Sequence, residues 1–253
     1  MQRLLRLFCF ILLALMASGT FAAELTRADV QSTLKAAPAG QAARFTGQSL
    51  AGLDLHELDF TNADLSAADL SDADLRGAKL VGAKLVGAKL PRARLNLAWI
   101  MHADFSHADL SGAILETLVV SAGLETLPQE AASFVGANLS GASVMARFSL
   151  DDMRRANLSH LRASADMRNQ SMGLIRADFS RANLAGSDFT GAALGHANFE
   201  FAKLQGTNFS GADLTDADFA GADLTGANLT DADTTRTNFT SAALTGVTGL
   251  ARP

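Results

Sequence analysis

The feature that most constrains this chain is a five-residue period of apolar side chains. From Phe45 onward, a Leu, Phe or Ile recurs at every fifth residue for 15 consecutive positions, ending at Leu115. A second run of 15 positions extends from Leu174 to Leu244 and is broken only at Thr234. A period of five matches neither the 3.6-residue helix nor the two-residue strand, so each unit must contain its own turn.

The residues around each apolar position, which we call the central position, predict which side chains face inward. Ala commonly stands two residues earlier, at what we call the alanine position, and Asp or Asn stands between them, as in the stretch GADLTDADFAGADLTGANLTDAD over residues 211–233. If these two apolar residues point inward, the other three point to solvent, where polar side chains and turn-forming Gly belong. One unit alone buries too little to stay folded, so the units must stack.

Two regularities with a spacing of 20 residues predict four units in each coil. Phe recurs at this spacing in the second run, at Phe179, Phe199, Phe219 and Phe239, and again at Phe189 and Phe209. Outward charges of alternating sign recur at the same spacing in the first run, as in Asp64, Lys84 and Asp104. With 20 residues per coil, Phe stacks on Phe, and opposite charges lie about 4.8 Å apart on successive coils. The sequence therefore predicts an all-β solenoid with four sides.

These repeats resemble the pentapeptide repeat family, whose pattern is A-[D/N]-L-x-x. The lead-in FTGQSLAGLDLHELDFTNADL, residues 45–65, also looks like the usual start of such domains. The resemblance implies a right-handed quadrilateral β-helix with one pentapeptide on each side. Some members of the family mimic B-form DNA and bind DNA gyrase, whereas most have no assigned activity.

The N-terminal residues have the pattern of a secretory signal peptide. The stretch MQRLLRLFCFILLALMASGTFAAE begins with Arg3 and Arg6, continues with an uncharged run over residues 7–23, and ends in mostly small residues. We expect cleavage after Ala22, which leaves a chain without cysteine and without stable membrane insertion. The alternative is an uncleaved anchor, for which 17 uncharged residues are at the short limit of a membrane span.

The remaining chain divides into five predicted regions. The stretch LTRADVQSTLKAAPAG, residues 25–40, predicts a short helix that caps the first coil, with Thr26 and Asp29 at its start. The interpretation after a signal peptide over residues 1–22 is a capping helix over 23–42, a repeat block over 43–115, an irregular insertion over 116–131, short and degenerate repeats over 132–173, and a second block over 174–250.

No catalytic, cofactor-binding or metal-binding constellation is found in the sequence. His102 and His107 are five residues apart, so they occupy the same position of successive units and point to different sides of the coil. A metal site needs convergent ligands. The abundant Asp residues carry no information about catalysis, because the repeat itself requires outward polar groups.

Five residues are candidates for contact with a partner. Trp99 stands at an outward position that usually carries Asp or Lys, and Val81 and Met101 are predicted to point outward on the same face. An exposed apolar patch can mark a contact site, although the insertion after Leu115 could instead fold back over it. Arg154 and Arg155 belong to the degenerate segment. Its irregular sequence indicates either a binding role or a repeat that has merely lost its pattern.

These observations favour an exported, non-enzymatic scaffold for protein–protein interaction in the periplasm of a Gram-negative bacterium, or secreted, with no identified partner. Without Arg3 and Arg6, 19 basic residues stand against 26 acidic ones, a net charge of −7, which disfavours nucleic acid as a partner. The bare C-terminal coil predicts a possible end-to-end homodimer. The alternatives are a DNA-mimicking gyrase-binding protein of the cytosol and a membrane-tethered scaffold.

Overall fold

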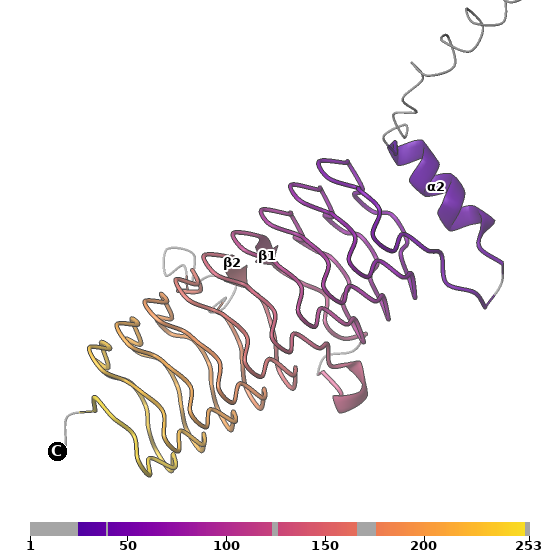
Figure 1. Cartoon of the computed structure of the whole chain (residues 1–253). Coiled ribbons are helices and arrows are strands. Elements are labelled where there is room, and N and C mark those ends of the chain that lie inside the picture. Colours follow the sequence, from indigo (N-terminus) through magenta and orange to yellow (C-terminus); the bar gives the residue numbers. More distant parts are fainter. Residues whose placement is uncertain (1–24, 39, 123–125, 166–175, 251–253) are drawn as a thin grey trace, which may run out of the picture.

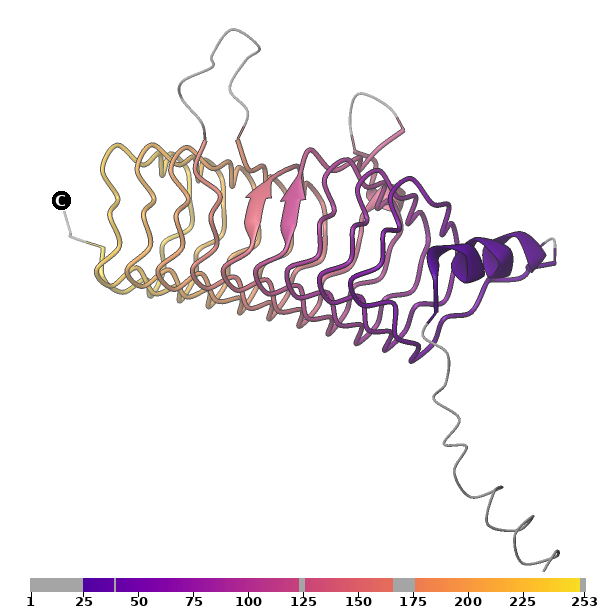
Figure 2. The same cartoon turned by 90° about the horizontal axis from the view of Figure 1, so that it is seen from above.

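The structure is a computed structural model that describes residues 25–38, 40–122, 126–165 and 176–250. The chain winds into a single stack of coils, with a helix at the N-terminal end and an uncovered coil at the C-terminal end (Figures 1 and 2). The predicted signal peptide over residues 1–22 lies outside the described residues.

Parallel bridges between successive coils hold the stack together. In both regular blocks each bridge joins positions one full coil apart, such as Asp64 to Lys84 and Asp178 to Asn198. In these blocks the backbone N–H of a central residue donates across the same gap wherever a further coil follows, as Leu80 N does to Trp99 O at 2.8 Å. Each side is only a few residues long because a turn follows every central residue. Among the described residues, the segments with more than an isolated bridge are β1 (Ile114–Glu116) and β2 (Ser143–Met145), which pair in parallel.

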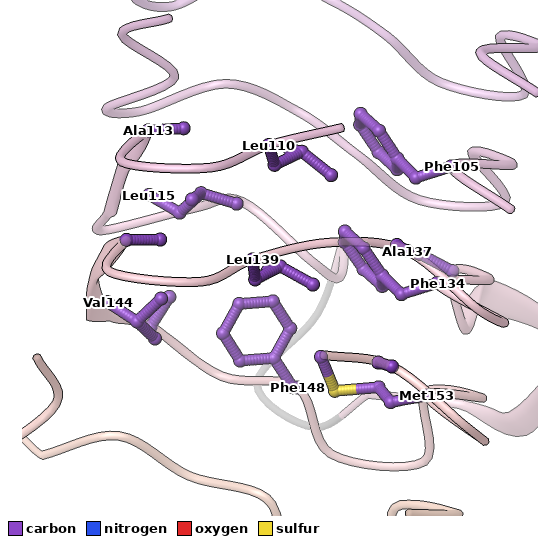
Figure 3. Packing of buried hydrophobic residues seen from close by; sticks show 14 of the residues in the cluster. Phe105, Leu110, Ala113, Leu115, Phe134, Ala137, Leu139, Val144, Phe148 and Met153 are labelled. Atoms are coloured by element: carbon purple, nitrogen blue, oxygen red, sulfur yellow. The ribbon is translucent and has the colours of Figure 1, made fainter. Parts of the chain in front are cut away.

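The core is a set of columns in which like side chains stack on like. Figure 3 shows Phe105 above Phe134 and Leu110 above Leu139, all fully buried. In the C-terminal block Phe199 lies between two further rings, with centroids 5.1 Å from Phe179 and 4.7 Å from Phe219. The aromatic stacking that the regular Phe spacing predicts is therefore present in the structure.

The turns between sides place one residue in the left-handed region, and many of these residues are not glycine. His107 has a φ of 58° and His160 a φ of 55°. Their side chains extend along the solenoid toward the next coil, which has Gly136 or Gly191 at the corresponding turn. A Cβ at Gly136 would lie 2.7 Å from His107 Nδ1. A large turn residue thus occupies the space that the following glycine leaves.

The helix α2 (Arg27–Ala36) packs against the first coil. Thr26 is its N-cap, and the Thr26 side chain and Asp29 form a capping box. Val30 is completely buried in the hydrophobic core. On the polar side, the guanidinium of Arg27 donates to the carbonyl oxygens of Asp54 and His56, at 2.7 and 2.9 Å. The helix therefore contacts the first coil through both apolar and polar contacts.

The regular coil continues one unit beyond the predicted boundary at residue 115. Leu118 and Val120 are buried, and Val119 is bridged to Trp99. Our prediction of an insertion beginning at residue 116 is wrong at its start, because Leu118 fills an alanine position and Val120 a central one. The insertion follows Val120 and contains the 3₁₀ helix η1 (Pro128–Glu130). Bridges across it, such as the one from Asp104 to Ser133, join positions further apart in sequence than the regular bridges do.

The middle of the chain remains in the coil although its repeats are degenerate. Phe148 and Met153 are fully buried at central positions. Phe148 follows Val144 one residue earlier than the five-residue period requires. The residues bridged along this coil are therefore closer together in sequence by one residue, as are Asn138 and Asn157. The bridges to the next coil, such as Arg147 to Asp178, pass over a longer insertion. The five-residue register returns because the deletion and this insertion together change it by a multiple of five.

The two ends of the solenoid differ in how well their cores are covered. Residues 43–229 include most of the fully buried side chains, whereas Phe239, Leu244 and Val247 are only partly buried. Nothing comparable to α2 covers this end within the described residues, which end at residue 250. The last coil therefore exposes part of an apolar core.

Candidate functional site

The irregular region contains a cleft on one side of the solenoid. We call this side the Trp99 side; its bridged outward residues are Asp59, Lys79, Trp99, Val119, Arg147, Asp178, Asn198, Asp218 and Asn238. The cleft has a volume of about 520 Å³ and lies between residues 117–121 of one coil and residues 145–147 of the next. It continues outward to Arg176, Asp178 and Asn198.

The cleft opens because two neighbouring coils diverge at this point. At the preceding corner the ladder is intact, with β1 paired to β2 and Thr117 N donating to Met145 O at 2.9 Å. Beyond that corner, no bridge joins Val119 to Arg147, although the structure describes both residues. The chain reaches Phe148 from Val144 one residue early, so it cannot follow the full turn of the coil before it. The missing residue therefore separates the two strand edges.

The walls of the cleft combine apolar surface with two guanidinium groups. Leu118, Val119, Val120, Met145 and Ala146 supply the apolar part. Arg147 and Arg176 supply the positive charge, and Asp178 is the acidic residue among the lining side chains.

The carboxylate of Asp178 already accepts two hydrogen bonds near its own turn. The Ser149 hydroxyl donates to it at 3.0 Å and the Ser180 backbone N–H at 2.9 Å. These bonds partly satisfy the one acidic group, while two guanidiniums line the same cleft.

An exposed apolar strip borders the cleft at its N-terminal end. The Trp99 side chain is 39% exposed, and its backbone is bridged to that of Val119, which lines the cleft. Leu97, at the preceding turn, is 57% exposed. Its backbone N–H donates to Glu116 O in β1. Apolar and basic groups thus follow one another along a continuous path, which we call the Trp99 groove: Leu97, Trp99, Val119, Arg147 and Arg176.

A second cleft of about 340 Å³ shares Arg147 and Asp178 with the first. It adds Arg181 and Phe201, and the Phe201 side chain is 60% exposed. Phe201 occupies a left-handed turn position, where Gly is common in this chain, and lies against Gly221 of the next coil. The groove therefore has a further apolar residue beyond its basic centre.

Two of the predicted contact residues have different surroundings from those we expected. Met101 is only 7% exposed, so its assignment to an exposed patch is wrong. The end of the insertion returns beside this turn, where His102 N donates to the Glu130 carbonyl at 3.0 Å. Val81, one coil earlier, is half-buried. Of the three residues predicted on this face, Trp99 is the one that lies beside the cleft.

Arg154 and Arg155 are exposed but lie at a different corner, on the turn after the side that carries Asp152. Arg154 forms a salt bridge with Asp152 at 2.6 Å, and its hydrogen bond is the main reason that the pKa of that carboxyl lies below its usual range. The structure does not bring these two arginines together with Trp99.

Sequence reasoning missed Arg147, Arg176 and Val119 as parts of the site. A usable signal was present, since Phe148 follows Val144 one residue too early for the repeat. A deletion within a five-residue unit must disturb the ladder on one side, and the groove is on that side.

A buried carboxyl group lies close to the same joint. Asp151 occupies an alanine position, is 2% exposed, and accepts a hydrogen bond from Ala132 N at 2.8 Å. Its other carboxyl oxygen has no partner among the described residues. Burial raises the pKa of Asp151 to about 8, so the group is largely protonated at neutral pH.

Within the described residues, no three His, Cys, Asp or Glu side chains converge in a way that would hold a metal ion. His102 and His107 lie on separate turns, each with a positive φ. None of the helices in the described part of the chain has the length and hydropathy that a bilayer-spanning segment needs.

The structure therefore defines a β-solenoid with an amphipathic groove on one side. The sequence profile described as Pentapeptide repeats matches the chain in eight copies, over residues 41–77, 78–116, 174–200, 192–231 and 212–248. The chain belongs to the pentapeptide repeat family, as its repeats predicted. Members of this family form right-handed quadrilateral β-helices and are generally structural or binding proteins rather than enzymes.

Several solved structures are similar to the chain. HetL, a pentapeptide repeat protein involved in heterocyst differentiation regulation from the cyanobacterium Nostoc sp. strain PCC 7120, is 29% identical. The match covers 90% of this chain and all of HetL, with a TM-score of 0.42. QnrB1, a plasmid-mediated fluoroquinolone resistance protein, is 20% identical over 80% of this chain and 83% of its own, with a TM-score of 0.35.

A pentapeptide repeat protein of the Arabidopsis thaliana thylakoid lumen is 29% identical over 48% of this chain and 72% of its own, with a TM-score of 0.22. No curated protein sequence matches the chain.

Proposed function

We propose that this protein is an exported, non-enzymatic repeat scaffold that binds a partner protein in the cell envelope, in the periplasm or outside the cell. The observation that carries the proposal is a closed ladder of coils that opens beside Trp99 into a groove with apolar and basic walls. A ladder of this kind holds surface side chains in fixed positions, and irregular segments on rigid scaffolds commonly carry binding sites.

The export part of the proposal is supported by the N-terminal sequence. Two arginines, an uncharged apolar run and a small-residue stretch precede Leu25, where the described structure begins. The chain without residues 1–22 contains no cysteine, since Cys9 is the single cysteine of the sequence. It therefore suits an oxidising compartment without needing disulfides.

Fractionation of cells that express the intact gene, with the N-terminus read by mass spectrometry, tests this proposal. We expect an envelope or secreted product that begins at Ala23. A cytosolic product that retains Met1 would overturn the export proposal, and a gyrase supercoiling assay would then test the DNA-mimic alternative. A membrane-bound product that retains Met1 would identify a tethered scaffold.

The C-terminal end supports a second proposed interaction, an end-to-end homodimer. The partly exposed Phe239, Leu244 and Val247 would be covered by the equivalent residues of a second copy. Light scattering over a range of protein concentrations tests this, and a mass that stays monomeric at high concentration would contradict it.

A further inference from the structure

The turn that leads into Ala132 lacks the hydrogen bond that closes the regular turns. In a regular turn the N–H of the alanine position donates to the carbonyl oxygen three residues earlier, as Ala137 N does to Phe134 O at 3.0 Å. Ala132 makes no such bond within the described residues, because the insertion separates it from the central residue Val120. The Asp151 carboxyl, on the next coil, accepts the Ala132 N–H instead, at 2.8 Å. A side chain thus replaces the missing carbonyl oxygen.

This hydrogen bond is tied to the protonated form of the Asp151 carboxyl. Asp151 is buried, and its second carboxyl oxygen has no partner among the described residues. A carboxylate in this place would be a buried charge with a single hydrogen bond, whereas a protonated carboxyl is neutral and still offers an acceptor to Ala132 N. In the regular block a neutral group has the equivalent place: the Thr207 hydroxyl, also buried at an alanine position, donates to Leu184 O at 3.0 Å.

The charged groups around Asp151 belong to the coil before it, its own coil and the coil after it. They stand at turns and outward positions: Glu130, Arg147, Asp152, Arg154, Asp178 and Arg181. Within the described residues, none of them forms a hydrogen bond or an ion pair with the Asp151 carboxyl. Burial is therefore the dominant influence on this group, and it raises the pKa of Asp151 to about 8.

The segment that precedes Ala132 is held to the solenoid by few contacts. We call residues 126–131 the return segment; it includes η1, none of whose residues is buried. The backbone carbonyl of Glu130 accepts from His102 N at 3.0 Å, while its carboxylate accepts from Ser121 Oγ and Leu127 N within the insertion itself, at 2.8 and 3.0 Å. Hydrogen bonds rather than apolar burial hold the return segment, and such segments open at low free-energy cost.

The return segment lies over an apolar side chain. His102 N donates to Glu130 O as Gly82 N, one coil earlier, donates to Met101 O, so Glu130 follows Met101 in the same column of turn residues. Met101 is only 7% exposed in this arrangement, whereas Trp99, two residues earlier, is 39% exposed. Opening of the return segment would therefore add Met101 to the exposed apolar surface beside Trp99.

We infer that Asp151 is a proton-dependent latch, which fastens the return segment to the next coil while its carboxyl is protonated and releases it, uncovering Met101, when the proton is lost. The sign follows from the burial: the closed state holds the proton up to about pH 8, whereas the water-exposed carboxyl of the open state titrates near 3.8. The opening equilibrium should therefore rise by up to about tenfold per pH unit between these values and level off above pH 8. The latch depends on neither export nor partner binding.

Amide hydrogen exchange of the purified full-length protein, read by NMR from pH 5 to pH 8, tests the inference. This range avoids the titration of Glu130, whose pKa its hydrogen bonds to Leu127, Ser121 and Ala122 lower. Protection factors remove the pH dependence of the chemical exchange step itself. We expect the protection of Ala132 N–H to fall by up to about tenfold per pH unit and to lie below that of Ala137 N–H at every pH.

Two variants and a second measurement separate the latch from general effects of pH. Asp151→Asn keeps an acceptor and cannot ionise, so the protection of Ala132 should not change with pH. Thr207→Ala, the matched control, removes a buried hydrogen bond in the regular block and should leave the pH dependence as it is. Oxidation by peroxide, mapped by mass spectrometry, should modify Met101 faster at pH 8 than at pH 5 in the unsubstituted protein, with the fully buried Met153 as internal reference.

Four results would overturn the inference. They are a protection of Ala132 that does not change with pH, equal pH dependence in the unsubstituted protein and Asp151→Asn, equal protection of Ala132 and Ala137 at every pH, and an oxidation rate of Met101 that is the same at pH 5 and pH 8. The third result would show that both amides exchange only through global unfolding. If Asp151→Asn does not fold, the pH series and the oxidation of the unsubstituted protein decide the matter.

Discussion

The C-terminal block and the middle of the chain use the same coil but differ in how strictly they keep its period. Over residues 178–248 every bridge keeps the regular spacing of one full coil. On the Trp99 side of this block, Phe rings stack with centroids 4.7–5.4 Å apart. In the middle, the spacing of the bridges first lengthens, then shortens and then lengthens again. The solenoid therefore tolerates extra residues at turns.

The place of an irregularity in the coil matters more than its size. The insertion before Ser133 lengthens the spacing of the bridges across it, yet the ladder resumes without a gap at Asp104 and Ser133. The cleft of about 520 Å³ lies where a single residue is missing between Val144 and Phe148, beside the start of the insertion after Val120. An insertion at a turn can loop outward, whereas a deletion shortens the coil itself and separates it from its neighbour.

The largest effect that tests this comparison is expected in the regular block. Phe199→Ala removes a fully buried ring that stacks on Phe179 and Phe219, and we expect a loss of about 3–5 kcal/mol in the free energy of unfolding. Phe201→Ala, two residues away on an exposed turn, is the matched control and should change stability by less than about 0.5 kcal/mol. Urea denaturation followed by circular dichroism measures both; similar losses would show that the core of this block is not organised as described.

A pH-dependent effect is expected at the irregular joint, from Asp151. Burial raises the pKa of this carboxyl in the folded protein from 3.8 to about 8, so between these values the folded state holds one more proton than the unfolded state. Stability should therefore fall as pH rises, by up to about 1.4 kcal/mol per pH unit, and level off above pH 8. Denaturation curves from pH 5 to 9 measure the slope.

Asp151→Asn keeps an acceptor for Ala132 N and cannot ionise, so it should reduce the pH dependence and be more stable than the unsubstituted protein at pH 8. Equal slopes in the two proteins would exclude Asp151 as the titrating group.

A smaller effect distinguishes turns that are crowded from turns that are open. Gly191 and Gly211 have φ values of 62° and 64°, so Ala adds a similar backbone cost at each. A Cβ at Gly191 would lie 2.8 Å from His160 Nδ1, whereas none of the atoms around Gly211 lies within 4 Å. We expect Gly191→Ala to cost about 0.5–1.5 kcal/mol more than Gly211→Ala, because the His160 ring must leave its preferred position. Thermal unfolding of both variants measures this difference in stability. The extra cost of Gly191→Ala should vanish when it is introduced into the His160→Ala variant.

The smallest effect is expected at the exposed charge ladders. Arg92 and Asp72 form a salt bridge at 2.5 Å between successive coils, and this pairing lowers the pKa of Asp72. Both side chains are more than half exposed, so solvent and salt screen the pair. Arg92→Ser should lower the melting temperature slightly at low ionic strength and not measurably in concentrated salt. A large effect that persists in salt would indicate that these ladders contribute more than the core columns suggest.

The five-residue period predicted much of this structure because it acts on each unit locally. Ala and a larger apolar residue alternate inward at fixed positions, so Leu75 and Phe219 are as buried as the pattern requires. The same reasoning placed Trp99 on the surface. The same reasoning failed where a unit departs from the pattern. Leu118 and Asp151 stand at alanine positions, and neither residue indicates from the sequence that the coil continues.

Spacing along the chain is thus enough to predict the family, the stacking of like side chains and the outward polar positions. The tertiary structure decided which outward residues become neighbours across a break. Trp99 and Arg147 are far apart in the sequence, with an insertion between them, and both border one groove because Val119, which is bridged to Trp99, lines the same cleft as Arg147. Met101, close to Trp99 in the repeat, is buried because the end of that insertion returns beside it.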